Sequence, residues 1–296
     1  MRLIVVLGTN ASGKSGLGVE LALRYGGEII SADSRQVYRG MDLGSGKITP
    51  EEMRGVPHHL LDVRDPGDFF SMADFQRLAY EAIDDVIGRG KSPFLVGGTG
   101  LYVDAVADGY VFSDKMPDLD YRAELEKLDT PALYQMLLER VPDTDVDRNN
   151  RNRVMRLLEK LNDGDDVIPG KKPRYEVLRL GVTWEREVLR RRIDERLDRR
   201  LQAGMIDEVA RLRGSGVSDE FLLKLGLEYK LITQYLRGDI ATEGEMKALL
   251  STAIKQFAKR QMTWFRRNPS ICWLNMNGDP VGEACALIDS FLGARL

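Results

Sequence analysis

Residues 8–15 read Gly8-Thr9-Asn10-Ala11-Ser12-Gly13-Lys14-Ser15, a complete G-x-x-x-x-G-K-S phosphate-binding loop. The apolar run Leu3-Ile4-Val5-Val6-Leu7 precedes it, and leucines spaced for a helix follow it. A buried strand, a glycine turn and a helix N-terminus together direct backbone N–H groups at an anion. The stretch therefore predicts a di- or triphosphate site, with Lys14 on the outer phosphate oxygens and the Ser15 hydroxyl on a magnesium ion. An ordinary glycine turn is the alternative.

The composition is that of a soluble globular protein. Of the 296 residues, 43% are hydrophobic and 30% are charged. No apolar run approaches the roughly 20 residues that span a bilayer, so no membrane association is expected. The chain opens on a strand pattern without a signal-peptide pattern, and Cys272 and Cys285 form neither a zinc motif nor a disulfide framework. A cytoplasmic location is expected.

The charge is spread unevenly along the chain. The formal net charge of −3 argues against nucleic-acid binding. However, six basic residues and no acidic one lie between Met246 and Leu274, and four arginines without an acid lie in residues 148–156. Such segments can contact phosphates. Solvated helix faces are the alternative, which composition alone favours.

The first hundred residues alternate strand and helix. Helices are predicted at about 14–25 and 71–90, the second with Ser71 as N-cap and Asp74 at the capping-box position. The predicted strands are 3–7, 28–32, 59–63 and 94–96. This alternation is typical of a parallel sheet with helices on its faces.

The pattern changes near Ser113. Residues 113–172 are helical in pattern, and a strand pattern returns at 176–182. The fold expected is therefore an α/β, P-loop NTPase-like parallel-sheet core, residues 1–112 and 173–296, with an inserted all-helical domain, residues 113–172. The remaining predicted elements are helices at 184–213, 219–237 and 243–266, a short strand at 271–274 and a terminal helix.

Polar residues follow two further predicted strands. Ligands of an open parallel sheet lie at the carboxyl ends of its strands, which is where Asp33 and Thr99 are placed. Asp33 is the candidate for proton abstraction, and a helix cap or an outer magnesium ligand is its alternative role. Thr99 could donate a hydrogen bond to a leaving phosphate oxygen, or it could be an unremarkable turn threonine.

Two other features carry less information. His58 and His59 are the only histidines, and consecutive strand positions point to opposite sides, so they make a poor metal site and are interpreted as structural. Asp42 and Lys47 lie in a loop near the same edge of the sheet, and their spacing assigns them no specific role.

Several segments keep the order and spacing of motifs found in one enzyme family. They are Gly8–Ser15, Asp33-Ser34 with Tyr38, Met41–Ser45 with Lys47, His58–Asp62, Phe70–Phe75, Val96–Tyr102, Asn152–Glu159 and Ala258–Arg266. Through them essentially the whole chain resembles the tRNA dimethylallyltransferases, or isopentenyl-tRNA transferases.

The chain departs from the family pattern in three places. Thr9-Asn10 replaces the usual Pro-Thr, and Asn149-Asn150-Arg151 stands where the family has N-D-P. Lys224 lies near the position of a family arginine, so the residue that grips the diphosphate from this side is left unassigned.

The resemblance implies a substrate and a mechanism. Dimethylallyl diphosphate, not ATP, would occupy residues 8–15, and the N6 amine of the adenine 3′-adjacent to the anticodon would attack its allylic carbon. Lys14, the loop amides and magnesium, with Ser15 as the metal contact, would stabilise the departing diphosphate. Asp33 would accept a proton from the amine and help hold the adenine, and Thr99 would donate a hydrogen bond near the breaking bond.

The resemblance also implies a tRNA acceptor, bound through its anticodon stem-loop by a monomer. A base in a folded loop must be flipped to reach such a site. Because localised basic patches can bind RNA on a chain of net negative charge, the resemblance reverses the preference for solvated faces. The tRNA-binding residues implied are Asp33, Ser34, Arg35, Gln36, Thr99, Arg122, Asn152, Arg153, Val154, Met155, Arg156, Lys259 and Arg260.

Three other functions share part of this evidence. A P-loop kinase of a small molecule has the same loop and core, with Asp33 activating a hydroxyl and the insertion acting as a lid. A cytokinin-type isopentenyltransferase would use free adenine nucleotides, but the insertion and the basic C-terminal stretch favour a large RNA. A nucleotide switch is the least favoured, because no segment reads as guanine recognition.

Overall fold

The computed structural model describes residues 1–112, 118–164 and 170–293. The chain divides into two compact units, one formed by Met1–Asp108 with Pro173–Leu296 and the other by Gly109–Lys172. The second unit therefore begins four residues before the expected insertion, at Gly109, and ends at the same residue.

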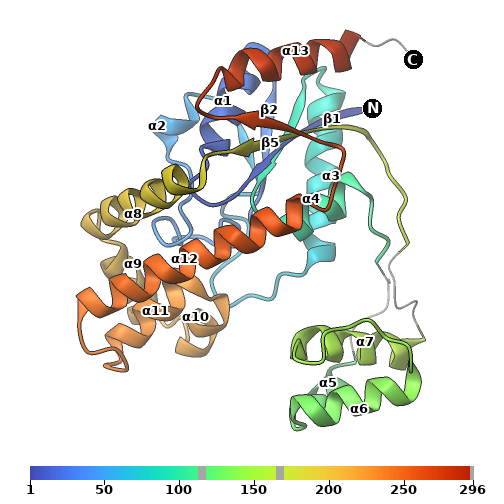
Figure 1. Ribbon diagram of the computed structural model, residues 1–296, viewed down its shortest axis with the longest axis vertical. Coiled ribbons are helices and arrows are strands. Elements are labelled where there is room, and N and C mark those ends of the chain that lie inside the picture. Colours follow the sequence, from blue (N-terminus) through green and yellow to red (C-terminus); the bar gives the residue numbers. More distant parts are fainter. Residues whose placement is uncertain (113–117, 165–169, 294–296) are drawn as a thin grey trace. The chain divides into compact units, whose positions relative to one another are not determined.

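The first unit is built on a six-stranded parallel sheet with the order β3-β2-β4-β1-β5-β6 (Figure 1). Its strands are β1 (Arg2–Gly8), β2 (Glu28–Ala32), β3 (His58–His59), β4 (Pro93–Gly97), β5 (Glu176–Thr183) and β6 (Ile271–Asn275). Because all the strands are parallel, their carboxyl ends meet at one edge, where ligands of open α/β sheets bind.

The strand predicted at 59–63 is wrong in extent, since β3 covers only His58–His59. Leu60 and Asp62 have positive φ angles of 66° and 56°, which end the extended backbone at once. The edge strand is therefore short, and the chain turns back toward the segment after β2.

Alternate residues of β1, β2, β4, β5 and β6 face two separate cores. Helices α1 (Lys14–Arg24) and α13 (Pro280–Gly293) pack on the face that carries Ile4 and Val6. Helices α3 (Met72–Gly88) and α4 (Gly100–Ala107) pack on the opposite face. The Ser71–Asp74 capping box at the start of α3 is confirmed.

The helices after β5 form a third core beside the sheet. The predicted helices 184–213 and 219–237 are each divided in two, at Gly204 (φ 95°) and Gly226 (φ 79°), because left-handed backbone interrupts a helix. The resulting elements are α8 (Arg186–Gln202), α9 (Met205–Gly214), α10 (Asp219–Leu225) and α11 (Leu227–Leu236). Helix α12 (Glu243–Phe265) continues from this group to α4 (Figure 1).

The second unit has its own hydrophobic core. Helices α5 (Leu119–Glu126), α6 (Thr130–Arg140) and α7 (Arg151–Asp163) surround it.

The remaining short helix of the first unit is α2 (Pro50–Met53). Within the described ranges, none of the helices combines the length and apolar character that a membrane span requires.

Candidate active site

Residues 8–15 connect β1 to α1 as the motif predicts. Gly13 has φ 88°, which glycine adopts without strain. A side chain at Gly8 would place its Cβ only 2.5 Å from Cγ2 of Val182, so the loop packs against β5 too closely for any other residue. Lys14 Nζ donates to the carbonyl oxygen of Thr9 at 3.3 Å, inside the loop. The sequence therefore forms a closed turn with its lysine folded over it.

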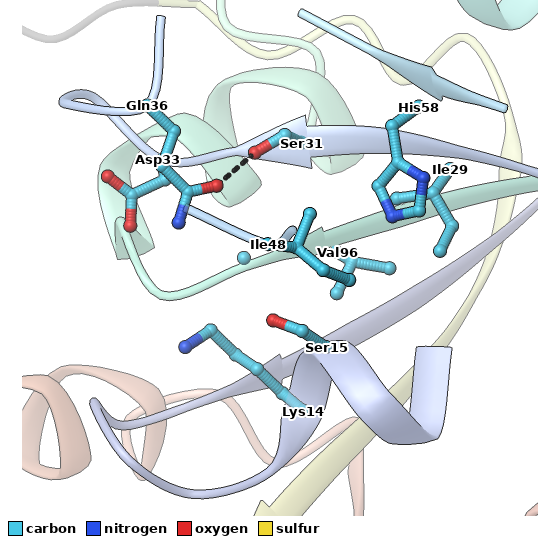
Figure 2. A pocket seen from close by; sticks show the side chains of 10 residues that line it. Lys14, Ser15, Ile29, Ser31, Asp33, Gln36, Ile48, His58 and Val96 are labelled. Carbon is cyan, nitrogen blue, oxygen red and sulfur yellow. Dashed lines mark hydrogen bonds between the residues drawn. The ribbon is translucent and has the colours of Figure 1, made fainter. Parts of the chain in front are cut away.

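A pocket opens beside this loop (Figure 2). Lys14 and Ser15 extend into it from the start of α1, and Asp33 and Gln36 enter from the segment after β2. The other lining residues are Ile29, Ser31, Ile48, His58, Val96 and Gly97. One part of the pocket is therefore polar and carries opposite charges, and the other part is apolar.

The surroundings of Lys14 lower the pKa of its side chain. Burial lowers the pKa of its ammonium group to about 8; the charge of Asp33 opposes this shift and that of Arg196 adds to it. A cation that is desolvated in this way interacts strongly with an anion that replaces its lost water.

Asp33 and Thr99 are brought together across neighbouring strands. The backbone N–H of Arg35 donates to Asp33 Oδ1 at 3.0 Å, which closes a turn after β2. The backbone N–H of Ser34 donates to Thr99 Oγ1 at 3.2 Å. Thr99 is the N-cap residue of α4, but its side chain makes no capping hydrogen bond. Its hydroxyl oxygen instead accepts the hydrogen bond from Ser34, in the segment that carries Asp33. The predicted pair thus shares one edge of the sheet.

The residues of this pocket fit a magnesium ion that is shared with a phosphate. Ser15 and Asp33 both line the pocket and offer the oxygen ligands that magnesium prefers. In the part of the chain that the structure describes, no three carboxylate, histidine or cysteine side chains gather as a metal site. Magnesium commonly takes one or two protein oxygens and completes its shell with water and phosphate.

Side chains far along the chain hold the phosphate loop from outside, and the sequence patterns did not reveal them. The oxygen Oε1 of Gln261 accepts from the Asn10 N–H at 2.8 Å, and its Nε2 donates to the Gly98 carbonyl at 2.7 Å. Trp184 Nε1 donates to the Ser12 carbonyl at 2.8 Å. Only Gln261 stood in a motif, and nothing in that motif indicated its partners.

Two arginines of α8 add to this set. Arg192 Nε donates to the Ala11 carbonyl at 3.1 Å. Arg196 donates from its two terminal nitrogens to Asn10 Oδ1 at 2.9 Å and to the Gly46 carbonyl at 3.0 Å. Burial is the larger cause, and the charge of Arg200 the second cause, of the lowered pKa of Arg196, which is about 10.

A buried carboxylate ties the segment after β2 to the helical cluster. Glu228, 1% exposed, accepts from Arg35 and from Arg200, each at 3.1 Å. Burial raises the pKa of Glu228, but the charges of Arg200 and Arg35 outweigh it, so the carboxylate pKa is lowered. Arg35 also lies 5.7 Å from the ring centre of Phe257. The predicted tRNA contact Arg35 is therefore largely enclosed by protein.

Lys224 does not line the pocket. It lies exposed on α10 and pairs with Glu220 at 2.7 Å.

The loop that contains Asp42 and Lys47 is held by the ammonium group of Lys47, which contacts Asp42 at 2.6 Å and Asp62 at 2.5 Å. The structure therefore gives Lys47 and Asp42 contacts within the loop, which spacing alone had left open.

The two histidines have structural partners. His59 Nε2 lies 2.8 Å from Glu28 Oε2, and His58 Nδ1 lies 2.8 Å from the Val56 carbonyl oxygen. Burial lowers the pKa of His58. His58 also forms part of the pocket wall, a position that the sequence did not indicate.

The predicted RNA contacts of the second unit differ in accessibility. Asn152 and Arg153 are exposed on α7. Val154 and Met155 are 0% and 6% exposed and belong to the core of this unit, so their side chains are not presented to RNA as predicted. The apolar residues of α7 that pack into the core of the second unit include these two positions.

The other basic side chains are placed as follows. Arg122 and Arg156 contact opposite oxygens of the nearly buried Glu159, at 3.2 and 3.1 Å. In the first unit, Lys259 and Arg260 are exposed on α12. Each of these four cations keeps part of its surface open to a polyanion.

The parallel sheet, the phosphate loop and the polar residues at neighbouring strand ends define an α/β protein of the P-loop class. The family model described as "IPP transferase" matches residues 36–268. The chain belongs to the IPP transferase family.

Individual proteins agree with this assignment. The chain is 46% identical to "tRNA dimethylallyltransferase 2" of Shewanella sediminis, covering 97% of each chain. A crystal structure of a tRNA isopentenylpyrophosphate transferase from Bacillus halodurans is 40% identical, with a TM-score of 0.74, and covers 99% of this chain and 95% of its own. A eukaryotic dimethylallyltransferase described as acting on tRNA is 25% identical, with a TM-score of 0.83, and covers 100% of this chain and 80% of its own.

Proposed function

We propose that this chain transfers a dimethylallyl group from dimethylallyl diphosphate to the N6 amine of the adenine 3′-adjacent to the anticodon of tRNA, releasing diphosphate. The observation that carries the proposal is that Lys14 and Asp33 line one pocket from opposite sides. A cation for the leaving group and a carboxylate for the amine proton are thereby placed together. The relatives named above support the tRNA acceptor.

The residues suggest the following steps. The amine nitrogen forms a bond to the allylic carbon while the bond from that carbon to the diphosphate oxygen breaks. Lys14 and the amides of residues 8–15 stabilise the negative charge that develops on the diphosphate. Thr99 donates a hydrogen bond to the departing oxygen, and the Asp33 carboxylate accepts the proton that the amine loses.

Magnesium is proposed as the cofactor. The Ser15 hydroxyl, with oxygens of the diphosphate, would hold it. When bound, it supplies positive charge that lowers the energy of the leaving diphosphate.

The RNA is proposed to bind through its anticodon stem-loop, with each unit contributing its own exposed cations, the second unit from α7 and the first from α12. Arg153, Lys259 and Arg260 would contact phosphates, and the target base would flip toward Asp33. We propose that the protein acts as a monomer. The free Cys272 and Cys285 suit the reducing cytoplasm that we propose as its location.

The test uses labelled dimethylallyl diphosphate and magnesium with unmodified tRNA or AMP as acceptor. The expected result is label in tRNA, reduced by about 10²–10⁴ in Asp33→Ala. Asp65→Ala is the control, because Asp65 is 69% exposed and its carboxylate pairs with Arg39 at the surface. Label in AMP alone would indicate a cytokinin-type enzyme, and ATP turnover without transfer would indicate a kinase.

A further inference from the structure

Tyr102 carries a hydroxyl that the proposed mechanism does not use. Its ring stacks on that of Phe75, with the ring centres 4.1 Å apart and the planes inclined by 21°, and the residue is 8% exposed. Within the ranges that the structure describes, this hydroxyl has no hydrogen-bond partner. A polar group that is taken out of water without a partner is costly, so this one requires an explanation.

The backbone mounts Tyr102 beside the reacting groups. It lies one helical turn after Thr99, its N–H donates to the Thr99 carbonyl at 2.9 Å, and residues three apart on a helix share a face. The Thr99 N–H donates to the Ala32 carbonyl at 3.3 Å, and Thr99 Oγ1 accepts from the Ser34 N–H. The first turn of α4 is therefore fixed to the segment that carries Asp33.

The electrostatic surroundings of the hydroxyl also indicate that Asp33 is near. Burial raises the pKa of Tyr102 far above its usual value. The charges of Tyr38, Asp33 and Asp74, in that order, raise it further. The phenol is therefore an O–H donor at neutral pH, and neither of the two neighbouring carboxylates accepts a hydrogen bond from it.

A donor and an acceptor that are close together but not bonded to each other match a ligand that carries both kinds of group on one edge. Adenine has such edges, because its N6 amine donates while the ring nitrogens on either side of that amine, N1 and N7, accept. When Asp33 accepts from the amine, as proposed above, a donor beside Asp33 faces one of these two nitrogens.

We propose that Tyr102 donates a hydrogen bond to N1 or N7 of the flipped adenine and thereby orients the base for attack. This inference rests on the proposed function, because it concerns the same acceptor base. Tyr102 and Asp33 would read one edge of that base together. Guanine carries an oxygen in place of the amine, so it would face Asp33 with a second acceptor and be rejected.

The test combines Tyr102→Phe with anticodon stem-loops in which 1-deaza-adenine or 7-deaza-adenine replaces the target adenine. With dimethylallyl diphosphate and magnesium, Tyr102→Phe should lower kcat/KM for the adenine stem-loop about ten-fold. One of the two analogues should cause a similar loss with the unsubstituted protein. The variant and that analogue together should give no further loss, because both changes remove the same hydrogen bond.

Two results of these assays would overturn the inference. One is a kcat/KM of Tyr102→Phe within two-fold of normal, and the other is a set of losses that multiply for both analogues. Tyr80→Phe is the matched control, since Tyr80 packs against the same core but its hydroxyl donates to the Val106 carbonyl at 3.5 Å. Its kcat/KM should stay within about two-fold of normal, and its response to both analogues should be unchanged.

Thermal unfolding without RNA separates recognition of the base from a structural role. Because the hydroxyl has no partner in the described part of the protein, Tyr102→Phe should unfold no more than about 3 °C below the unsubstituted protein. A larger fall, or failure of this variant to fold, would overturn the inference. Failure of the unsubstituted protein to modify the adenine stem-loop would instead overturn the proposed function.

Discussion

The side-chain oxygen of Gln261 accepts a hydrogen bond from the backbone N–H of Asn10 at 2.8 Å. The same amide donates to the Gly98 carbonyl at 2.7 Å, and a Cβ at Gly98 would lie 2.8 Å from Gln261 Nε2. One side chain of α12 therefore connects the phosphate loop to the turn that carries Thr99. Because Lys259 and Arg260 are exposed on the same helix, the proposed RNA surface and the diphosphate site share one rigid element.

Gln261→Leu should lower kcat about ten-fold. The substitution leaves the Asn10 N–H and the Gly98 carbonyl without their partner, at a cost of roughly 1–3 kcal/mol. Gln256→Leu, at an exposed position of the same helix, is the control and should leave kcat unchanged. Steady-state transfer assays with tRNA measure both. Equal kcat values for the two variants would show that the bridge does not position the loop.

Thr99→Val should reduce the rate of transfer about a hundred-fold, the order of effect seen when one donor to a developing anion is removed. The valine keeps the shape of the side chain but cannot accept from the Ser34 N–H or donate to the diphosphate. Thr99→Ser retains the hydroxyl and should stay within about three-fold of normal. Single-turnover assays compare them, and equal losses in both variants would indicate a packing role instead.

Glu228→Gln should lower the free energy of unfolding by about 3–5 kcal/mol, because it leaves Arg35 and Arg200 without their shared carboxylate in a buried site. Glu220→Gln is the matched control. Glu220 pairs with Lys224, and its side chain is 76% exposed. The substitution should therefore change the free energy of unfolding by less than about 0.5 kcal/mol. Urea unfolding measures both, and similar changes would argue against a buried network.

Stability should fall in acid partly through Glu28. Hydrogen bonds from Arg89 lower the pKa of this carboxyl far below its usual range; burial opposes them, and Lys91 and His59 add to them. A depressed folded-state pKa gives stability above the unfolded value of about 4.3, and that stability is lost as the pH falls toward the folded value.

Urea unfolding at pH 7 and at pH 3.5 tests this expectation. Glu28→Gln should be less stable than the unsubstituted protein at pH 7 by about 1–3 kcal/mol. This difference in stability should shrink at pH 3.5, because Glu28 is then protonated in the unfolded chain and the stabilisation that its carboxylate gives the folded state is reduced. A difference that is the same at both pH values would contradict the expectation.

Arg153→Ala should raise the KM for tRNA and leave the KM for dimethylallyl diphosphate unchanged. Loss of one phosphate contact should also reduce the slope of log affinity against log salt by about one. Arg140→Ala, exposed on α6 of the same unit, serves as the control. Binding of a labelled anticodon stem-loop across several salt concentrations measures the slope. An unchanged slope would remove Arg153 from the RNA surface.

The sequence by itself determined the features that depend on neighbouring residues. The strand, loop and helix around Lys14, and the capping box at Ser71, follow from local spacing and chemistry. Asp33 and Thr99 could be placed at one edge because parallel strands share their carboxyl ends. Local patterns failed at Gly204 and Gly226, where single glycines in left-handed backbone divide helices whose apolar spacing continues across them.

Only the tertiary structure decided which distant side chains complete the site. Gln261 and Arg196 reach the phosphate loop from 251 and 186 positions away, and their partners there are a backbone amide and a neutral side chain. No residue pattern records such contacts, because they depend on how α8 and α12 pack against the end of the sheet. Burial separated side chains in the same way, since it placed Val154 in a core and left Arg153 beside it in solvent.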